Sequence, residues 1–298
     1  MNEKMLCIYH SRDLDGWSSG MIVKRKFPWA DLIGYDYGNP IPEETISKYT
    51  SIMMVDISFP IDDMVRIAQN CSMFVWIDHH KAIIEEWKRR MDAGDVTLAH
   101  IRAVLDMSYA ACELTWRYCF PEEDVPMGIE LLGTYDSWRD SDKGFWETMV
   151  MPFQTMMKKV CFGPDTFPQV LFSRSADAED YVMFLIEAGK ILYSAKAYGD
   201  AKRCKTMAFE CSFDGYRAIA MIMAGSSTAF KSIWDPGKYD IMISFTTSGK
   251  FWTVSVYSTR EDIDCSAICK AHGGGGHKGA SGFQVADIQD VIGKFQYP

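Results

Sequence analysis

The segment that decides the fold is Phe74–His80, whose sequence FVWIDHH runs from four apolar residues directly into three polar ones. Two similar segments occur, because Leu6–Tyr9 is followed by His10 and Ile52–Val55 is followed by Asp56. Short apolar runs with helical stretches between them predict a parallel sheet covered by helices on both faces. Ligands of open α/β sheets bind at the carboxyl ends of the strands. The sequence therefore predicts an α/β fold with a polar site at that edge.

The chain divides by composition into two parts. We expect a parallel-sheet domain covered by helices over residues 1–176 and a connecting helix over 177–203, where apolar residues recur at helical spacing. Residues 204–298 are expected to form a smaller mixed-sheet α/β domain, because two pairs of strand-like runs flank the turn dipeptides Asp214-Gly215 and Ser248-Gly249. Residues 140–176 match no motif, and their role stays open.

Composition excludes several classes of protein. The 298 residues are 48% apolar and 24% charged, which excludes a disordered or fibrous chain. No apolar stretch approaches the roughly 18–20 residues that span a membrane. The net charge of −9 argues against a protein that coats long duplex nucleic acid. Nine cysteines without CxxC spacing, and no secretory segment at the start, predict reduced thiols in a cytoplasmic protein.

A crowded acidic turn follows the first strand. His10, Asp13 and Asp15 fall within six residues, and Arg12 offers one positive charge against two carboxylates. Such carboxylates repel each other unless a cation neutralises them, which favours a pair of metal ions that Asp56 is placed to bridge. Carboxylate and imidazole ligands suit Mn²⁺, Mg²⁺ or Fe. The alternative is that an aspartate only caps the next helix.

Candidate metal-binding residues also follow one further strand and one helical segment. In Asp78-His79-His80 the adjacent histidines cannot point the same way, so one can bind a metal while the other faces a phosphate. A packing or surface role is the alternative for this pair. Asp136 follows a helical segment and is either another ligand or the cap of a loop.

The second domain contains a glycine run between His272 and Gly282. Consecutive glycines let backbone N–H groups converge on an anion, and His277 and Lys278 add donors and charge. We therefore expect a phosphate-binding loop, with a merely flexible loop as the alternative. Arg260, which follows a strand, is a candidate bidentate phosphate clamp or an ordinary exposed arginine.

Together these motifs resemble the DHH phosphoesterase superfamily. Asp78-His79-His80 is the triplet that gives the superfamily its name, and the glycine run resembles the signature of the DHH-associated C-terminal domain. The residues that match its other metal motifs are His10, Asp13, Asp15, Asp56 and Asp136. The resemblance covers both domains, with five separated motifs in the right order. The nanoRNase/oligoribonuclease group is the most similar branch.

The resemblance implies a cofactor of two divalent ions, usually Mn²⁺, with Mg²⁺ as the alternative. The two implied ligand sets, which share one residue, are His10, Asp13 and Asp56 for one ion and Asp15, Asp56, His79 and Asp136 for the other. The implied catalytic residues are His80, at the scissile phosphate, and Asp78, which orients a histidine. The implied substrate-binding residues are Arg260, Gly274, Gly275, Gly276, His277 and Lys278.

The sequence thus predicts a metal-dependent phosphoesterase that hydrolyses short RNA or DNA oligonucleotides, or small nucleotides such as 3′-phosphoadenosine 5′-phosphate and dinucleotides. A single-strand exonuclease acting on longer chains stays open, although the acidic charge disfavours it. A family II inorganic pyrophosphatase shares the first-domain motifs but carries a basic clamp in place of the glycine run. A non-catalytic nucleotide-binding protein is disfavoured because every ligand is present. A homo-oligomer is compatible with the sequence.

Overall fold

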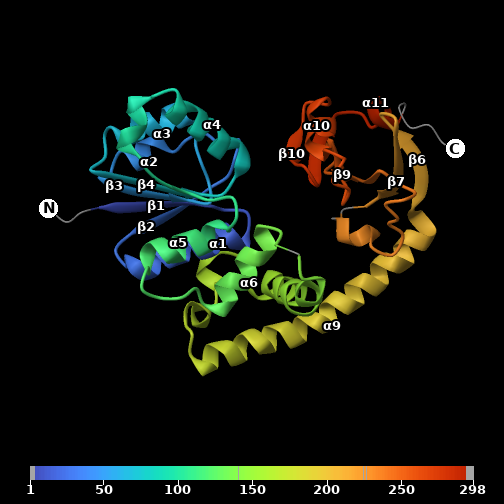
Figure 1. Ribbon diagram of the computed structural model, residues 1–298, viewed down its shortest axis with the longest axis horizontal. Coiled ribbons are helices and arrows are strands. Elements are labelled where there is room, and N and C mark those ends of the chain that lie inside the picture. Colours follow the sequence, from blue (N-terminus) through green and yellow to red (C-terminus); the bar gives the residue numbers. More distant parts are fainter. Residues whose placement is uncertain (1–3, 140, 224, 226, 293–298) are drawn as a thin grey trace. The chain divides into compact units, whose positions relative to one another are not determined.

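The computed structural model describes residues 4–139, 141–223, 225 and 227–292 (Figure 1). The chain forms two compact units, residues 1–193 and 194–298, and the division falls within one continuous helix, α9 (Ala176–Met207). The predicted connecting helix over 177–203 lies inside α9, whereas the predicted bounds of the two domains stay a prediction. No helix in the described part of the chain is both long and apolar enough to cross a membrane.

The first unit contains a parallel sheet of five strands in the order β2-β1-β3-β4-β5. The strands are β1 (Met5–His10), β2 (Asp31–Tyr35), β3 (Ser51–Val55), β4 (Met73–Asp78) and β5 (Arg102–Leu105). The three predicted apolar runs form β1, β3 and β4, the centre of the sheet, and their side chains are buried except that of Tyr9, which is partly buried. The predicted α/β class with a parallel sheet is therefore confirmed. The edge strand β5 is not predicted by the sequence. It has only four residues, it begins with an arginine, and none of its side chains is fully buried.

The register of the central strands aligns their carboxyl ends. Tyr9 is paired with Val55, and Val55 with Ile77. The residues that come next along the three strands are His10, Asp56 and Asp78. The sheet itself therefore brings the three polar strand ends side by side.

Helices cover both faces of this sheet (Figure 1). One face carries α1 (Leu14–Lys26), α5 (Ala111–Cys119) and α6 (Met127–Asp136), and the other carries α2 (Glu43–Ile46), α3 (Ile61–Ala68) and α4 (Lys81–Asp92). The stretch left open by sequence holds α7 (Lys143–Phe145), a π-helical turn (Trp146–Val150) and α8 (Met151–Val160). It also contributes core residues such as Phe153 and Phe172, so one of its roles is structural. Short 3₁₀ turns of the chain cover Val96–His100, Pro164–Thr166, Gln169–Phe172 and Ser227–Phe230.

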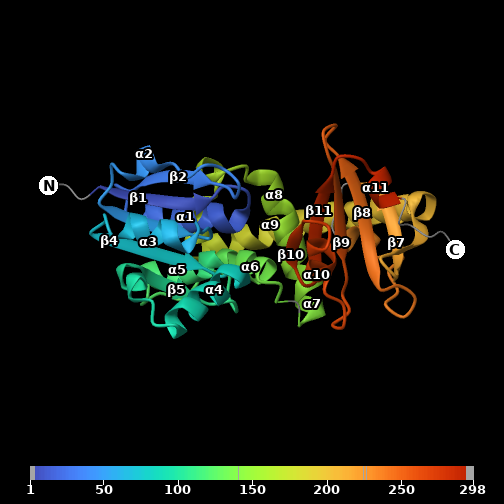
Figure 2. The same ribbon diagram turned by 90° about the horizontal axis from the view of Figure 1, so that it is seen from above.

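The second unit contains a mixed six-stranded sheet in the order β10-β11-β9-β8-β7-β6 (Figure 2). Its elements are β6 (Phe209–Phe213), β7 (Tyr216–Ile222), β8 (Ile241–Thr247), β9 (Trp252–Tyr257), α10 (Cys265–Lys270), β10 (Gly275–His277), β11 (Ala280–Val285) and α11 (Gln289–Ile292). Both predicted hairpins are present. Asp214 and Gly215 have φ angles of 49° and 86°, as a tight two-residue turn requires, and Gly249 has a φ of 87°.

Candidate metal centre

The turn from β1 into α1 is built around a glycine. A Cβ atom at Gly16 would lie 2.0 Å from the backbone oxygen of His10, so only glycine lets the chain turn this tightly. Asp13 caps α1 through a hydrogen bond of 3.0 Å that its carboxylate accepts from the Gly16 N–H. The capping alternative for Asp13 is therefore correct, but the same side chain also contacts His10, so capping is only part of its role.

We expect Gly16→Ala to destabilise the protein by about 1–3 kcal/mol, because the new methyl group meets backbone rather than a movable side chain. Urea unfolding followed by circular dichroism measures this change. Gly163→Ala is the matched control, since no atom lies within 4 Å of its Cβ position. Equal stabilities of the two variants would contradict the proposed tight packing at Gly16.

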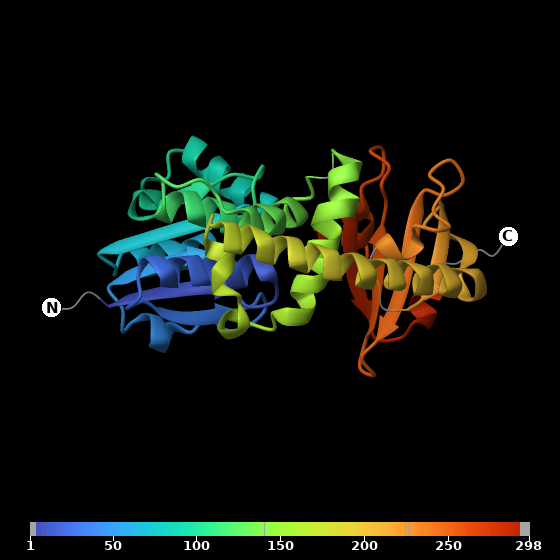
Figure 3. The ribbon, with the colours of Figure 1, turned by 90° about the horizontal axis from the view of Figure 1, so that it is seen from below.

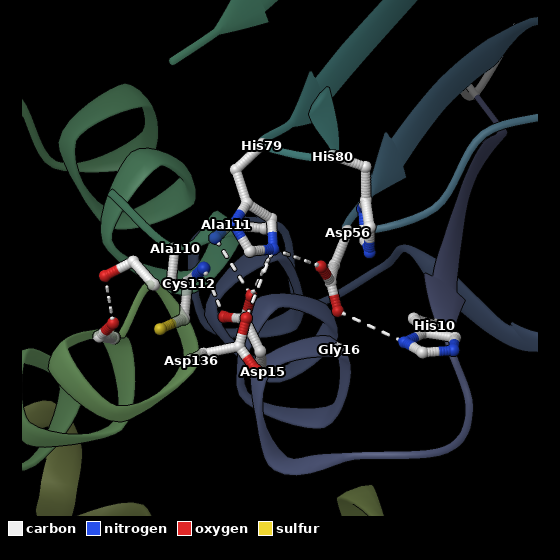
Figure 4. A network of polar contacts seen from close by, with 12 residues as sticks. His10, Asp15, Gly16, Asp56, His79, His80, Ala110, Ala111, Cys112 and Asp136 are labelled. Carbon is white, nitrogen blue, oxygen red and sulfur yellow. Dashed lines mark hydrogen bonds and ion pairs between the residues drawn. The ribbon is translucent and has the colours of Figure 1, made fainter. Parts of the chain in front are cut away.

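The first cluster of ligand atoms surrounds His10 (Figure 4). Its Nδ1 atom lies 2.8 Å from Asp13 Oδ2 and 3.4 Å from Asp56 Oδ2. Asp56 is 1% exposed and adopts a positive φ of 59°, which is uncommon for a residue other than glycine. These three residues form a group able to hold a cation.

The second cluster surrounds His79 (Figure 4). Its Nε2 atom lies 3.2 Å from Asp136 Oδ2, 3.4 Å from Asp56 Oδ1 and 3.5 Å from Asp15 Oδ2. Asp136 is the last residue of α6, so a helix distant in sequence completes this cluster. The structure thus brings all six sequence-predicted ligand residues together, with the Asp56 carboxylate between the two histidines.

The orientation of Asp15 depends on the amino-terminal end of α5. The Asp15 carboxylate accepts hydrogen bonds from the backbone N–H groups of Ala111 at 3.0 Å and Cys112 at 2.7 Å. The start of a helix carries unpaired N–H groups and favours a negative charge. The buried Glu113 accepts a hydrogen bond from the Ala110 N–H at 3.3 Å and forms an ion pair with Arg139 at 2.8 Å. Both contacts stabilise this end of α5.

Asp78 holds the histidine pair in place. Its Oδ1 atom accepts hydrogen bonds from the backbone N–H groups of His79 and His80 and lies 2.7 Å from His80 Nδ1. Trp76 donates its indole N–H to Asp78 Oδ2 at 3.2 Å. Burial would raise the pKa of Asp78, but the bonds to His80 outweigh burial and lower the pKa. Asp78 is therefore an ionised, fully buried carboxylate that orients His80.

The cluster carries an excess of negative charge. Burial, together with Asp56 and Asp136, raises the pKa of Asp15 well above its ordinary value. Burial alone would lower the pKa of both histidines, but the surrounding carboxylates outweigh it. Asp13 and Asp56 raise the pKa of His10 to about 10, and Asp136 and Asp56 raise the pKa of His79 to about 12. A site of this kind attracts cations.

Three buried atoms in the cluster have no hydrogen-bond partner. They are His10 Nδ1, Asp56 Oδ1 and His79 Nε2. Buried polar atoms are nearly always hydrogen-bonded, so three exceptions in one place call for a missing partner. Imidazole nitrogen and carboxylate oxygen are ligands of Mn²⁺, Mg²⁺ and Fe. The residues present therefore fit divalent metal ions.

The glycine run of the second unit is part of a hairpin, not the open loop that the sequence predicted. Gly275–His277 forms β10 and pairs antiparallel with β11. A Cβ atom at Gly274 would lie 2.2 Å from Gly282 O, and one at Gly276 would lie 2.7 Å from Ser281 Oγ. Close packing therefore explains two of the glycines. The anion-binding role of Gly274, Gly275, Gly276, His277 and Lys278 stays a prediction.

Arg260 is engaged by acidic residues of its own unit. Its guanidinium donates to Asp262 at 2.9 Å and to Asp240 at 2.6 Å. A phosphate would have to compete with these carboxylates for the same N–H groups. The role of Arg260 as a phosphate clamp stays a prediction.

Sequence reasoning missed two residues beside the candidate metal ligands. The half-exposed ring of Tyr37 has its centre 6.0 Å from that of His10 and 6.1 Å from that of His80. Asp36 Oδ1 lies 3.7 Å from His10 Nε2. Both residues directly follow β2, so the rule that polar strand ends gather at one edge of a parallel sheet would have found them.

No protein-family model matches the chain, but the chain is similar to several individual proteins. Protein R106 of Acanthamoeba polyphaga mimivirus, whose function is uncharacterised, is 22% identical over 320 residues that cover 96% of this chain and 68% of R106. A solved DHH domain is described as belonging to a family of ribosomal proteins. It is 14% identical to this chain, the match covers 94% of this chain and 82% of the solved chain, and the TM-score is 0.58. The pGpG-specific phosphodiesterase PggH from Vibrio cholerae is 11% identical to this chain. The match covers 97% of this chain and 95% of PggH, and the TM-score is 0.47.

Proposed function

This chain has the fold of DHH-domain proteins, and from that premise we propose that it is a metal-dependent phosphoesterase acting on short oligonucleotides or small nucleotides. The observation that carries the proposal is the set of three buried ligand atoms that lie close to ion-pair partners but make no hydrogen bond, at the carboxyl edge of the parallel sheet. This edge is where open α/β folds bind their ligands.

In this proposal the two groups around His10 and His79 hold one divalent ion each. The ligand sets, which share Asp56, are His10, Asp13 and Asp56, and Asp15, Asp56, His79 and Asp136. Two divalent ions held by these residues would supply Lewis acidity and would lower the pKa of a bound water. The two oxygens of Asp56 face different histidines, at 3.4 Å each, which suits a carboxylate that bridges two ions.

His80 is proposed to bind the scissile phosphate. Because Asp78 holds His80 Nδ1 at 2.7 Å, the opposite ring nitrogen is left for the substrate. The negative charge of Asp78 and the hydrogen bond raise the pKa of His80 against the lowering effect of burial. A protonated imidazole donates to a phosphoryl oxygen and offsets its charge. Asp78 is thus a positioning residue.

We expect Asp78→Asn to lower kcat by about 10–100-fold, the usual cost of losing a group that orients a residue of a metal site. Metal affinity, measured by calorimetry, should change much less than kcat, because Asp78 is not in either ligand set. Asp106→Asn is the control: Asp106 follows β5 at the same sheet edge and accepts the Ser108 N–H, a turn role that asparagine also fills. A loss of metal binding equal to the loss in kcat would contradict the positioning role.

The second unit is proposed to bind the rest of the substrate. In this proposal residues 1–176 form the metal-binding domain, 177–203 the connecting helix and 204–298 the substrate-binding domain. The segment Gly274–Lys278 and Arg260 are proposed to hold the substrate's terminal phosphate or its neighbouring nucleotide. The net charge of −9 supports a small substrate, because long nucleic acids need a basic channel.

The proposal is tested by hydrolysis assays with Mn²⁺ or Mg²⁺. The substrates are 5′-labelled RNAs of two, three, five and twenty-four nucleotides, 3′-phosphoadenosine 5′-phosphate, linear and cyclic dinucleotides, and pyrophosphate. Rates highest on the shortest RNAs or on the small nucleotides support the proposal. Preference for the longest RNA favours an exonuclease, and preference for pyrophosphate favours a pyrophosphatase. If the metal-loaded protein binds nucleotide but hydrolyses none of these substrates, the protein is a non-catalytic nucleotide-binding protein and the proposal is wrong.

A further inference from the structure

One face of α9 carries an exposed apolar stripe; Figure 3 shows the helix in yellow. Phe184, Ile191 and Tyr198 are 62%, 73% and 77% exposed. They are spaced seven residues apart, which returns a side chain to almost the same side of a helix. Ala188 and Ala195, which are at least partly exposed, fill the turns between them. The stripe is therefore continuous over four turns.

The opposite side of α9 packs against the protein. Val182, Leu185 and Ile186 are buried in the core of the first unit, and a Cβ atom at Gly189 would lie 2.0 Å from Pro152 O. At about 100° per residue, these positions lie roughly opposite the stripe. A helix with apolar residues on both sides has a second surface to cover, and an exposed patch of large apolar side chains marks an interaction site.

The two ends of the stripe carry opposite charges. Asp177 and Asp180 precede it, Lys202 and Lys205 follow it, and all four side chains are exposed. The helical spacing places them on the same side of α9 as Ile191. Glu187, which pairs with Lys190, is the charged residue at the edge of the middle of the stripe. An occupant of this face should therefore be mostly apolar in its middle, basic at one end and acidic at the other.

The helix itself matches that description, because its pattern is symmetric about Ile191. Phe184 and Tyr198 lie seven residues to either side, Asp180 and Lys202 eleven, and Asp177 and Lys205 fourteen. A second α9 laid antiparallel would pair Ile191 with its own copy, Phe184 with Tyr198, and each aspartate with a lysine. Such self-complementarity is what a twofold interface requires.

We propose that this face of α9 binds a second copy of the chain and forms an antiparallel homodimer. Parallel pairing would set aspartates against aspartates and lysines against lysines, which costs free energy. The antiparallel arrangement buries three large apolar side chains from each copy. None of the residues involved belongs to the metal centre, so the inference is independent of the proposed function.

The first test measures mass by sedimentation velocity on the full chain. We expect twice the 33.9 kDa of one chain at micromolar concentration. Ile191→Glu places two carboxylates against each other on the twofold axis and should raise the dimer dissociation constant by at least about tenfold, a penalty typical of like charges in contact. Met183→Glu, about 80° from Ile191 around the helix and 39% exposed, is the control and should stay dimeric. A monomeric wild-type chain, or an Ile191→Glu variant whose dimer dissociation constant equals that of the wild type, would overturn the proposal.

The second test decides the orientation by exchanging charges. One variant carries Lys202→Glu with Lys205→Glu, and the other carries Asp177→Lys with Asp180→Lys. Alone, each variant brings like charges together at both ends of the interface and should dimerise more weakly than the wild type. Mixed in equal amounts, the two variants should form a heterodimer with restored affinity, because every contact again joins opposite charges. A parallel dimer already joins like charges and would lose no affinity in either variant, so variants that dimerise alone as tightly as the wild type would overturn the antiparallel arrangement.

Discussion

Asp56→Asn is expected to reduce kcat/KM by more than about 100-fold, because losing a direct ligand should cost at least as much as losing a group that only orients one. The reason is the position of the Asp56 carboxylate, which lies 3.4 Å from both His10 Nδ1 and His79 Nε2 and belongs to both proposed ligand sets. An amide offers one oxygen and no charge, so it cannot serve two cations as the carboxylate does. Steady-state hydrolysis of the best substrate in the panel measures the effect.

Asp106→Asn again serves as the control and should change kcat/KM by less than about fivefold, since surface substitutions outside special sites usually stay within about 0.5 kcal/mol. Activity of Asp56→Asn near that of the control would rule out the shared-ligand role.

Removal of divalent metal is expected to abolish hydrolysis and to lower thermal stability. Three proposed ligand atoms make no hydrogen bond in the folded protein: His10 Nδ1, Asp56 Oδ1 and His79 Nε2. Without a metal ion, these buried polar atoms and the excess negative charge around them lower the stability of the folded state. An ion present at 100 times its dissociation constant stabilises the folded state by about 2.7 kcal/mol. For a unit of this size that corresponds to a rise in Tm of about 5–10 °C on metal addition.

Differential scanning calorimetry before and after dialysis against chelator, with Mn²⁺ or Mg²⁺ added back, measures the change in Tm alongside activity. Asp56→Asn should show a much smaller rise in Tm on metal addition than the wild type. Full activity of the wild type in excess chelator, after its metal content has been shown to be negligible, would contradict metal dependence.

Much of the first unit could be predicted from local sequence. Apolar runs ending in His10, Asp56 and Asp78 become the adjacent strands β1, β3 and β4, because a buried parallel strand needs continuous apolar residues. The turn dipeptides of the second unit predicted its hairpins, since a tight turn needs positive φ angles. By contrast, β5 is too short and too exposed to leave a pattern. The helices between 143 and 160 were left unassigned because no motif marks them.

The sequence by itself determined which residue types gather at the sheet edge, because the end of an apolar strand and the side chain that follows it are local properties. Only the tertiary structure decided how they are held. Asp15 is oriented by N–H groups of α5 nearly a hundred residues away, and Asp136 arrives from the end of α6. Tertiary packing likewise turned the predicted glycine loop into strand β10 and engaged Arg260 with two carboxylates. Such partners are invisible in sequence because hydrogen bonds and ion pairs between distant segments depend on the folded path of the chain, not on spacing along it.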